Sequence, residues 1–471
     1  MSDTGIPVDV CVIGAGPAGS AFAARLAGMG HKVVIVEKSD FPRPHVGESL
    51  TPAAWDLLDV IGARDFISSR VRIRKGPVVR VKWGSGEVRE LRHSADHSPF
   101  TVDRGDFDSA LLDLARAAGA KILQPAMART LRRLQDRWEI ELVDHCSPSR
   151  ITARFLADAS GRSRVLGGNP VRFPQRLLAI EGRWASAGTD GKTRIESGNH
   201  AWYWGAHLPD ATFSAMVFVD LAHYAGPLLA RHRLESLYGE LLNRSELLRG
   251  LTKPTRPGPL MAHDASCYSD PNPIDRVSIR LGEAAFAIDP LSSAGVQKAL
   301  QTALTGSIVA NTILTDGNTE AAIDFYRDAQ RRSVEQHQTW TEGFYGLTDV
   351  FGGPSGGRHT EESLESSGER RELSGSAWVR LADAARIVSL PCLVGDRVEV
   401  RGALSHPSLS RPVAYVGGVY LQPLLNDLSE WRSLQVVRDS WQRSVGTSQV
   451  AGIIQWLSSN GLLDVNMTRK E

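Results

Sequence analysis

The chain has 471 residues, 42% of them hydrophobic and 23% charged, and a formal net charge of +1. This length and composition predict two or three globular domains with large buried cores, and the near-neutral charge argues against a nucleic acid or an anionic membrane as a partner. The four cysteines lack the spacing of a zinc site or a disulfide framework, and glycines interrupt the N-terminal apolar run, so we expect no bound metal, no signal peptide and a cytoplasmic protein.

Residues 8–37 predict a dinucleotide-binding βαβ unit. An apolar strand leads into a glycine-rich turn, then an alanine-rich helix, and then a second strand that ends at an acidic residue. The glycines allow a tight turn and a close approach of the backbone to a pyrophosphate at the helix N-terminus, and the acid can accept ribose hydroxyls. The alternative is a turn that serves packing alone. The cofactor-binding residues expected here are Gly14, Gly16, Ala18, Gly19, Glu37 and Lys38.

Residues 277–304 predict a second cradle for the far end of the same ligand. A short strand leads to a Gly-Glu pair, and the following Asp-Pro can fix a turn and accept a hydrogen bond from a polyol chain. The next helix begins at a glycine, and its N-terminus can stabilise a ring that becomes anionic on reduction. NAD does not need this second cradle, so the expected cofactor is FAD. The residues expected to bind it here are Gly282, Asp289, Pro290, Gly295 and Val296.

Three motifs together resemble those of the FAD-dependent monooxygenase superfamily with the aromatic-hydroxylase fold. They are the glycine-rich turn, "DASGRS" at residues 158–163 and the late motif at residues 282–290, and the resemblance covers roughly residues 7–347. It implies that Asp158 belongs to the cofactor site and that Arg104 lies near the ribityl and phosphate groups. The alternative for Arg104 is a surface arginine at the start of a helix. The late motif departs from the family by carrying glutamate instead of aspartate after its first glycine.

Other segments resemble the flavin-dependent halogenase branch of this superfamily. In "FPRPHVGESLTP", the turn Gly47-Glu48-Ser49 matches the halogenase turn that runs over the flavin. Lys75, eight residues before Trp83, matches the spacing of the halogenase lysine. "WYWGAHLP" at residues 202–209 resembles the Trp-x-Trp element, with two additional residues before Leu-Pro. The resemblance implies that Gly47, Glu48 and Ser49 bind the cofactor and that Lys75 is catalytic.

One departure from the halogenases changes the expected chemistry. Ser292 occupies the position at which tryptophan halogenases carry a glutamate, and serine cannot act as a carboxylate base. The resemblance then implies hydroxylation of an aromatic ring through a flavin C4a-hydroperoxide. Lys75 would serve as a hydrogen-bond donor or an acid, provided that burial lowers its pKa, and a solvated lysine is the alternative. The expected catalytic residues are Lys75, Trp202, Trp204 and Ser292.

Alternating segments between residues 171 and 263 predict an antiparallel sheet, which in this superfamily covers the flavin. Trp202 and Trp204 share one face of a strand, and Tyr203 takes the other face. The two tryptophans line an aromatic pocket in one interpretation and pack in the core of the sheet in the other.

The expected architecture is α/β, with a Rossmann-like FAD-binding domain, an antiparallel β-sheet substrate domain and a small C-terminal domain that resembles a winged helix. Its charges are balanced, so we expect this last domain to dock a protein substrate and not DNA. The boundaries are residues 1–75, 103–170 and 271–350 for the FAD-binding domain, 76–102 and 171–270 for the substrate domain, 351–376 for a linker and 377–471 for the C-terminal domain.

Within the branch, the sequence resembles the flavoprotein monooxygenases of tryptophylquinone biogenesis. This resemblance implies hydroxylation, twice over, of a tryptophan in a small protein subunit. It also implies O2 and either NAD(P)H or a separate flavin reductase as partners. We expect a monomer with no nucleic-acid or membrane partner. The alternatives are a halogenase, a small-molecule aromatic hydroxylase, a saturated reductase of the same fold and a non-catalytic flavin-binding redox chaperone.

Overall fold

The computed structural model describes residues 5–94, 97–143, 150–185, 190–228, 233–252, 258–351 and 377–467. The chain divides into two compact units. The N-terminal unit comprises residues 1–319 and 326–358, and the C-terminal unit comprises residues 320–325 and 359–471. The linker expected at residues 351–376 lies outside the described residues except for its first position.

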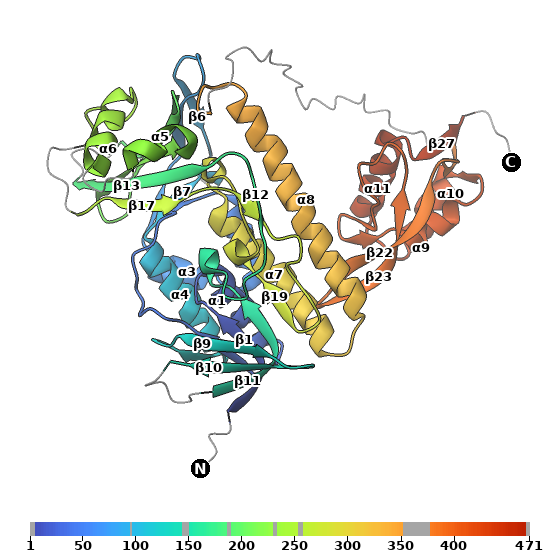
Figure 1. The fold of residues 1–471 in the computed structure, drawn as a ribbon. Coiled ribbons are helices and arrows are strands. Elements are labelled where there is room, and N and C mark those ends of the chain that lie inside the picture. The colour runs from blue at the N-terminus through green and yellow to red at the C-terminus, as the bar shows by residue number, and fades with distance from the viewer. Residues whose placement is uncertain are drawn as a thin grey trace. The chain divides into compact units, whose positions relative to one another are not determined.

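The N-terminal unit is built on a mixed sheet that contains the predicted βαβ unit (Figure 1). Its central strands pair in parallel, and every residue of the second strand, "VVIV", is buried, as expected for strands covered on both faces. Two antiparallel strands extend one side. In sheet order the strands are β8 (Lys121–Leu123), β2 (Val33–Val36), β1 (Ile6–Ile13), β11 (Arg150–Asp158), β10 (Trp138–Leu142) and β9 (Ala128–Arg133), and β19 (Ser278–Arg280) pairs with β11.

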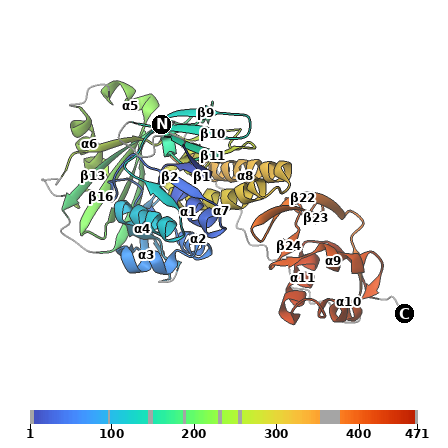
Figure 2. The same cartoon turned by 90° about the horizontal axis from the view of Figure 1, so that it is seen from below.

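Helix α1 lies between α4 and α7 and packs against both (Figures 1 and 2). The alanines and glycines of α1 are nearly all buried, and their small size lets the neighbouring helices approach closely. A second long helix, α8, follows α7. The helices are α1 (Pro17–Gly28), α2 (Ala53–Ile61), α3 (Arg64–Arg70), α4 (Arg104–Ala117), α5 (Leu221–Leu228), α6 (Arg233–Arg244), α7 (Gly295–Leu314) and α8 (Thr319–Tyr345).

The antiparallel sheet predicted for the middle of the chain is present, and two strands from residues 78–92 extend it, the first of them pairing in parallel with its neighbour. Trp202 and Trp204 pack on one face with Met216 and Phe218, and Tyr203 packs on the other face with residues of α6. The predicted alternation is therefore confirmed. In sheet order the strands are β17 (Met261–Asp264), β13 (Leu177–Ala185), β16 (Thr212–Asp220), β15 (Ala201–His207), β14 (Lys192–Gly198), β5 (Val78–Lys82) and β6 (Arg89–Arg92).

Two small sheets and several single-turn 3₁₀ helices lie around the predicted motifs in the described part of the N-terminal unit. One sheet joins the Gly-Glu-Ser segment to the strand that carries Lys75, and the other joins the late motif to the middle of the chain. These elements are β3 (Ser49–Leu50), β7 (Phe100–Val102) and β4 (Ile73–Lys75); β12 (Val171–Arg172), β18 (Tyr268–Ser269) and β20 (Phe286–Ala287); and η2 (Gly161–Ser163), η3 (Gly282–Ala284) and η4 (Pro290–Ser292).

The C-terminal unit has its own hydrophobic core, which includes Leu404, Trp441 and Leu457. From η5 to β27 it keeps the helix–strand–helix–helix–strand order of a winged helix, but the middle strand of its sheet, β21, precedes these helices in the chain, and a long hairpin forms a separate sheet. The elements are β21 (Trp378–Leu381), β22 (Arg386–Val394), β23 (Arg397–Ser405), β24 (Tyr415–Val416), β25 (Val419–Tyr420), α9 (Gln422–Leu425), η5 (Asn426–Leu428), β26 (Arg432–Ser433), α10 (Leu434–Trp441), α11 (Thr447–Ser459) and β27 (Leu463–Asn466).

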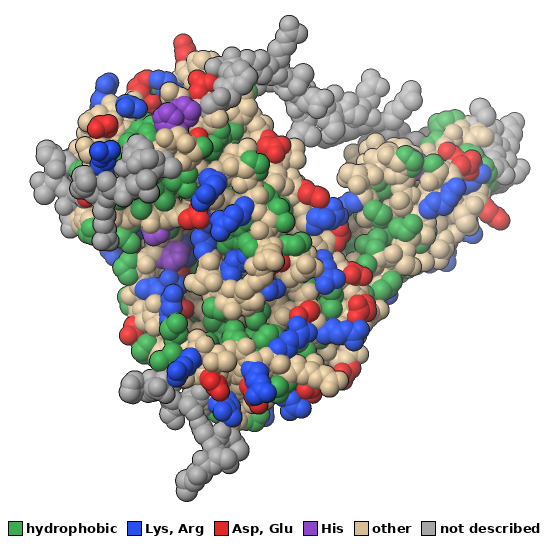
Figure 3. Space-filling view, viewed as in Figure 1, with side chains coloured by type: hydrophobic (Ala, Val, Ile, Leu, Met, Phe, Trp, Pro, Cys, Tyr) green, Lys and Arg blue, Asp and Glu red, His purple; other side chains and the backbone are tan. Residues whose placement is uncertain are grey.

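Basic and acidic side chains are interspersed over the visible face of the N-terminal unit, with no large field of one sign (Figure 3). Within the described part of the chain, no helix is long and apolar enough to cross a membrane. No group of three or more His, Cys, Asp or Glu side chains there is placed to hold a metal ion.

Candidate cofactor site

The glycine-rich turn between β1 and α1 has the geometry that the sequence predicts. Gly14 has a φ of +101°, and a Cβ there would lie 2.5 Å from the carbonyl oxygen of Ala159. A Cβ on Gly19 would overlap the carbonyl oxygen of Gly14, so this position also requires glycine. Near Gly16, by contrast, a Cβ would meet only the Arg43 guanidinium, at 3.8 Å. A side chain would therefore clash on the side of the turn that faces the sheet, whereas the backbone at Gly16 has room for a ligand beside it.

The N-terminus of α1 is free to bind an anion. Gly16 is its N-cap and supplies no side-chain hydrogen bond, and the first turn contains no acidic residue. Backbone N–H groups at such an end carry a partial positive charge that a diphosphate can satisfy. Arg43 adds a positive charge beside this helix end. The sequence did not assign Arg43 to the site, and the only signal for it was a basic residue within "FPRP".

Glu37 directly follows β2 and lies beside this turn. Its buried carboxylate accepts hydrogen bonds from the N–H groups of Ala15 (2.8 Å) and Ser39 (2.9 Å). A carboxylate has further lone pairs, so Glu37 can still accept a ribose hydroxyl. Lys38 is exposed, and its contact with the cofactor stays a prediction.

The late motif lies against the first turn, although almost 270 residues separate them in the sequence. Gly282 has a φ of +54°, and a Cβ there would lie 3.1 Å from the Cβ of Ala18. Helix α7 follows with Ala294 as an N-cap that supplies no side-chain hydrogen bond, no acid in its first turn and open space at Gly295. The structure thus brings together two uncapped helix N-termini, those of α1 and α7.

Asp289 is fixed in the turn before α7. Its carboxylate accepts hydrogen bonds from the Leu291 N–H (2.9 Å) and from the Tyr345 hydroxyl (3.1 Å to each oxygen). Burial raises the pKa of Asp289 to about 6, and these two hydrogen bonds work in the opposite direction. Ser292 donates to the Asp289 carbonyl (3.0 Å) and accepts from the Ala294 N–H (3.3 Å), so its hydroxyl maintains the turn. Its predicted catalytic role stays a prediction.

Helix α8 supports the Asp289 turn through two residues that the sequence pattern did not assign to the site. Tyr345 binds the carboxylate, and His337 accepts the Asp289 N–H at its Nε2 atom (3.0 Å). Burial and the nearby Lys298 lower the pKa of His337 to about 4, which keeps its ring neutral and able to accept. His337 and Tyr345 are eight residues apart, and this spacing places them on one face of a helix. The same spacing is equally typical of residues that pack in a core, so the sequence did not identify them as site residues.

Residues 41–51 connect the two turns. Arg43 lies over Gly16 at one end, and at the other end the Thr51 hydroxyl donates to Gln297 in the first turn of α7 (2.6 Å). Between them Gly47 has a φ of +95°, and a Cβ there would lie 3.1 Å from a guanidinium nitrogen of Arg104. The predicted Gly-Glu-Ser turn therefore lies between the two helix N-termini.

Arg104 is buried inside this segment, so the alternative of a surface arginine is wrong. Its guanidinium forms two 3.0 Å hydrogen bonds with Asp108 and donates to the Val46 carbonyl (2.8 Å). Burial lowers the pKa of Arg104, but the neighbouring carboxylates, Asp108 first among them, together raise it. Arg104 thus holds the backbone immediately before Gly47, and direct contact with the cofactor stays a prediction.

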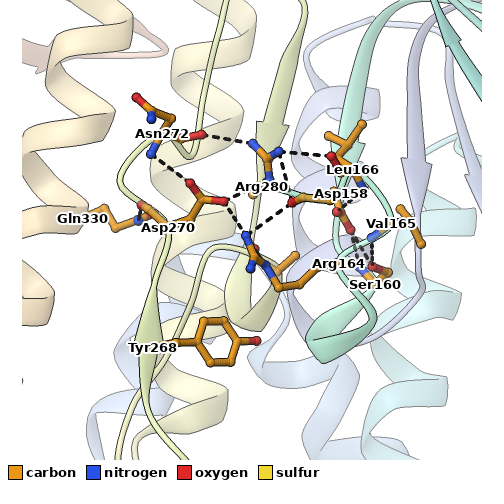
Figure 4. Close-up of polar contacts among 12 residues, drawn as sticks. Asp158, Ser160, Arg164, Val165, Leu166, Tyr268, Asp270, Asn272, Arg280 and Gln330 are labelled. Carbon is orange, nitrogen blue, oxygen red and sulfur yellow. Dashed lines mark hydrogen bonds and ion pairs between the residues drawn. The ribbon is translucent and has the colours of Figure 1, made fainter. Parts of the chain in front are cut away.

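Asp158 ends β11 and organises the loop of the "DASGRS" motif (Figure 4). Its carboxylate accepts from the Ser160 N–H (3.1 Å), the Ser160 hydroxyl (2.6 Å) and the Leu166 N–H (2.9 Å). In the same loop Arg164 binds the Asp270 carboxylate, which Arg280 also approaches at 3.3 Å. This network ties the loop to β18 and β19, and a contact of Asp158 with the cofactor stays a prediction.

The side chain of Lys75 is exposed at the end of β4, so the burial considered for it is absent. The expected role of Lys75 as an acid depended on that burial. Lys75 lines a small cavity of about 10 Å³ together with Ser49 and Thr101, and also a wider cleft of about 1120 Å³ beside Trp55. The structure therefore places two of the predicted site residues, Lys75 and Ser49, at one cavity.

Trp202 and Trp204 are 1% and 5% exposed and pack with Leu291 of the Asp289 turn and with Tyr345. Trp202 stacks on Phe218 with 3.8 Å between ring centroids. Their position favours core packing over an open pocket, although the buried Trp202 N–H has no hydrogen-bond partner among the described residues. The tryptophan face of the sheet therefore packs directly on the cradle.

These residues fit FAD. The open face of the first turn and the α1 N-terminus suit a diphosphate, the uncapped α7 N-terminus suits a ring that gains negative charge, and Asp289 can accept a hydroxyl of the connecting chain.

Comparison with known proteins agrees with this geometry. Residues 7–217 match the family described as an FAD binding domain. A tryptophan 2-halogenase of Chondromyces crocatus is 28% identical over an alignment of 344 residues. The alignment covers 68% of this chain and 64% of that relative, so it spans less than two thirds of the relative's length. The flavin-dependent halogenase CmlS has a TM-score of 0.74 at 21% identity, covering 99% of this chain and 97% of CmlS.

A further solved structure, the peptidyl tryptophan dihydroxylase QhpG, described as essential for tryptophylquinone cofactor biogenesis, has a TM-score of 0.72 at 24% identity. The likeness covers 97% of this chain and all of QhpG. The two structural likenesses establish the fold, and the sequence matches establish the cofactor. The chain therefore binds FAD through the domain at residues 7–217, has the fold of the flavin-dependent halogenases and is similar to one of them in sequence.

Proposed function

We propose that this protein is an FAD-dependent monooxygenase that hydroxylates a tryptophan side chain of a small partner protein. The observation that carries the proposal is the turn before α7. Residues 291–294 are Leu-Ser-Ser-Ala, and the Ser292 hydroxyl is engaged with the Asp289 carbonyl. A halogenation that requires a carboxylate base at this position has none available, whereas oxygen transfer to an electron-rich ring does not require one.

The residues of the chain have distinct roles in this proposal. Bound FAD supplies the chemistry by taking two electrons, from NAD(P)H or a separate flavin reductase, and activating O2. The α1 and α7 N-termini bind the diphosphate and stabilise negative charge on the ring. Trp202 and Trp204 keep water away from the ring, and Lys75 orients the reacting groups by donating a hydrogen bond from Nζ. The C-terminal unit docks the partner protein.

The likeness to QhpG supports this substrate class because it extends over the C-terminal unit as well. The likeness to CmlS has the same extent, however, and the sequence relatives reported above include a halogenase. A flavin-dependent halogenase is therefore the second candidate. The observation in its favour is the position of Lys75 at one cavity with Ser49.

Mass spectrometry of the product separates the two candidates. The protein loaded with FAD would be supplied with a reductant, O2, chloride and bromide, and with either a tryptophan-containing candidate partner protein or free indoles. We expect the partner's tryptophan to gain one or two oxygen atoms. Incorporation of chlorine or bromine, or turnover of free indoles alone, would contradict the proposal. A chain ending before residue 377 is expected to bind FAD normally and to lose turnover of the partner protein.

A further inference from the structure

Two buried carboxylates and one partly exposed arginine join the Gly47–Ser49 turn to the substrate sheet. Glu48 is 0% exposed, and Glu181 on β13 is 4% exposed. Arg183, two residues further along the same strand, binds both carboxylates, with Nη2 at 2.6 Å from Glu48 and Nε at 3.1 Å from Glu181. Two carboxylates therefore share one guanidinium in the interior of the unit.

The surroundings leave the cluster short of positive charge. The second oxygen of Glu48 accepts the Gly47 N–H (3.0 Å), and Glu181 also accepts the Ser214 hydroxyl (3.3 Å). The remaining charged groups that face the cluster come from the start of α4. Asp103 is 3.9 Å from Arg183, and Arg104 is already paired with Asp108.

The charge balance of this cluster requires a proton. With both glutamates ionised, the cluster carries one net negative charge in a buried position, and such a charge is costly. Protonation of one glutamate makes the cluster neutral and lets the two carboxyl groups share a hydrogen bond. Arg183 then remains paired on both sides.

We propose that Glu48 and Glu181 share one proton under Arg183, and that Glu181 and Arg183 are positioning residues that hold the flavin-facing Gly47–Ser49 turn against the substrate sheet. The proposal rests on FAD binding and is independent of the aromatic substrate. It assigns a role at the cofactor to two residues of the substrate sheet that no sequence motif indicates.

The pH at which the glutamate pair loses this proton can be measured. Burial first, and then the charge of Glu181, raise the pKa of Glu48 to about 7, whereas Arg183 lowers it. The cluster is therefore neutral below this pH and negative above it. Because FAD carries a negative diphosphate and its reduced ring becomes anionic, FAD affinity should fall as the pH rises through the midpoint. The expected loss is about threefold to tenfold for one added charge near a bound anion.

Three substitutions should move this midpoint in different directions. Glu181→Gln removes a charge that raises the pKa of Glu48, so the midpoint should fall. Arg183→Met removes a charge that lowers it, so the midpoint should rise, and Arg183→Lys should return it towards the wild-type value. Glu48→Gln should abolish the pH dependence. Glu246→Gln is the matched control, because Glu246 pairs with Lys82 at an exposed position and should leave the midpoint unchanged.

Two measurements on the full chain test these shifts. Infrared difference spectra of the FAD-free protein, titrated between about pH 5 and pH 9, should contain the carbonyl band of a buried protonated carboxyl that Glu48→Gln removes. Flavin fluorescence titrations at the same pH values give the FAD affinity. The proposal is overturned if the band is absent, or if Glu181→Gln leaves the midpoint unchanged or raises it. If Arg183→Met does not fold, the Glu181→Gln result decides alone.

Discussion

The two turns that hold the cofactor are supported in different ways. The first turn, before α1, is closed by its own glycines and by Glu37, which lies 22 residues from its partner Ala15. The second turn, before α7, depends on α8, because Asp289 is held by His337 and Tyr345, which are 48 and 56 residues away. The first turn is thus set mainly by local backbone geometry, although it also packs on the distant backbone of Ala159, and the second depends on side chains of a distant helix. Substitutions in the first turn should therefore act through backbone clash, and those in the second through hydrogen bonds and charge.

The largest effect is expected from Gly19→Ala in the first turn. The new Cβ would overlap the Gly14 carbonyl, so the backbone must shift, at a cost of about 3 kcal/mol and with loss of FAD binding. Urea unfolding and the flavin spectrum of the purified protein measure both effects. Gly239→Ala is the matched control, because a Cβ at this position in α6 has nothing within 4 Å, and it should stabilise the helix by about 0.5–1 kcal/mol. Equal effects of the two changes would contradict the account of the first turn.

Asp289→Asn tests the charge in the second turn. Burial raises the pKa of Asp289 from 3.8 to about 6, so ionising it costs stability, and this cost grows as the pH rises through that range and is complete above it. Asparagine cannot ionise. In urea unfolding of the FAD-free protein, the variant should gain about 1–2 kcal/mol relative to wild type between pH 5 and pH 8. A difference that does not change with pH would show that Asp289 is not the titrating group.

Tyr345→Phe tests the support from α8. It removes the hydroxyl that donates to Asp289, so we expect a loss of about 1 kcal/mol in stability and about threefold to tenfold weaker FAD binding. Tyr238→Phe, on the opposite face of the substrate sheet, removes a 2.9 Å hydrogen bond to the Ala215 carbonyl and serves as the control. This control should lose similar stability and keep its FAD affinity. Equal FAD affinity in both variants would mean that the second turn does not need Tyr345.

The smallest effect on folding and FAD binding is expected from Lys75→Met, which lies outside both turns. Because the Lys75 side chain is exposed, the change should alter stability by less than about 0.5 kcal/mol and leave the FAD dissociation constant within about twofold. Product formation should nevertheless fall if Lys75 orients the reacting groups. Wild-type product yields, measured at saturating FAD, would remove Lys75 from the proposed mechanism.

The sequence by itself determined the parts of this protein that are fixed by local geometry. The glycine positions around Gly14, the acid that follows β2 and the alternation of Trp202 and Tyr203 follow from the period of a strand and from backbone sterics, so the pattern predicts them directly. Only the tertiary structure decided how buried charges are paired. The burial of Arg104, the exposure of Lys75, the support of Asp289 by α8 and the contact of Glu48 with Arg183 depend on which distant elements pack together. No local pattern specifies such partners, because a buried charge can be balanced from any neighbouring element, and the fold alone determines which element that is.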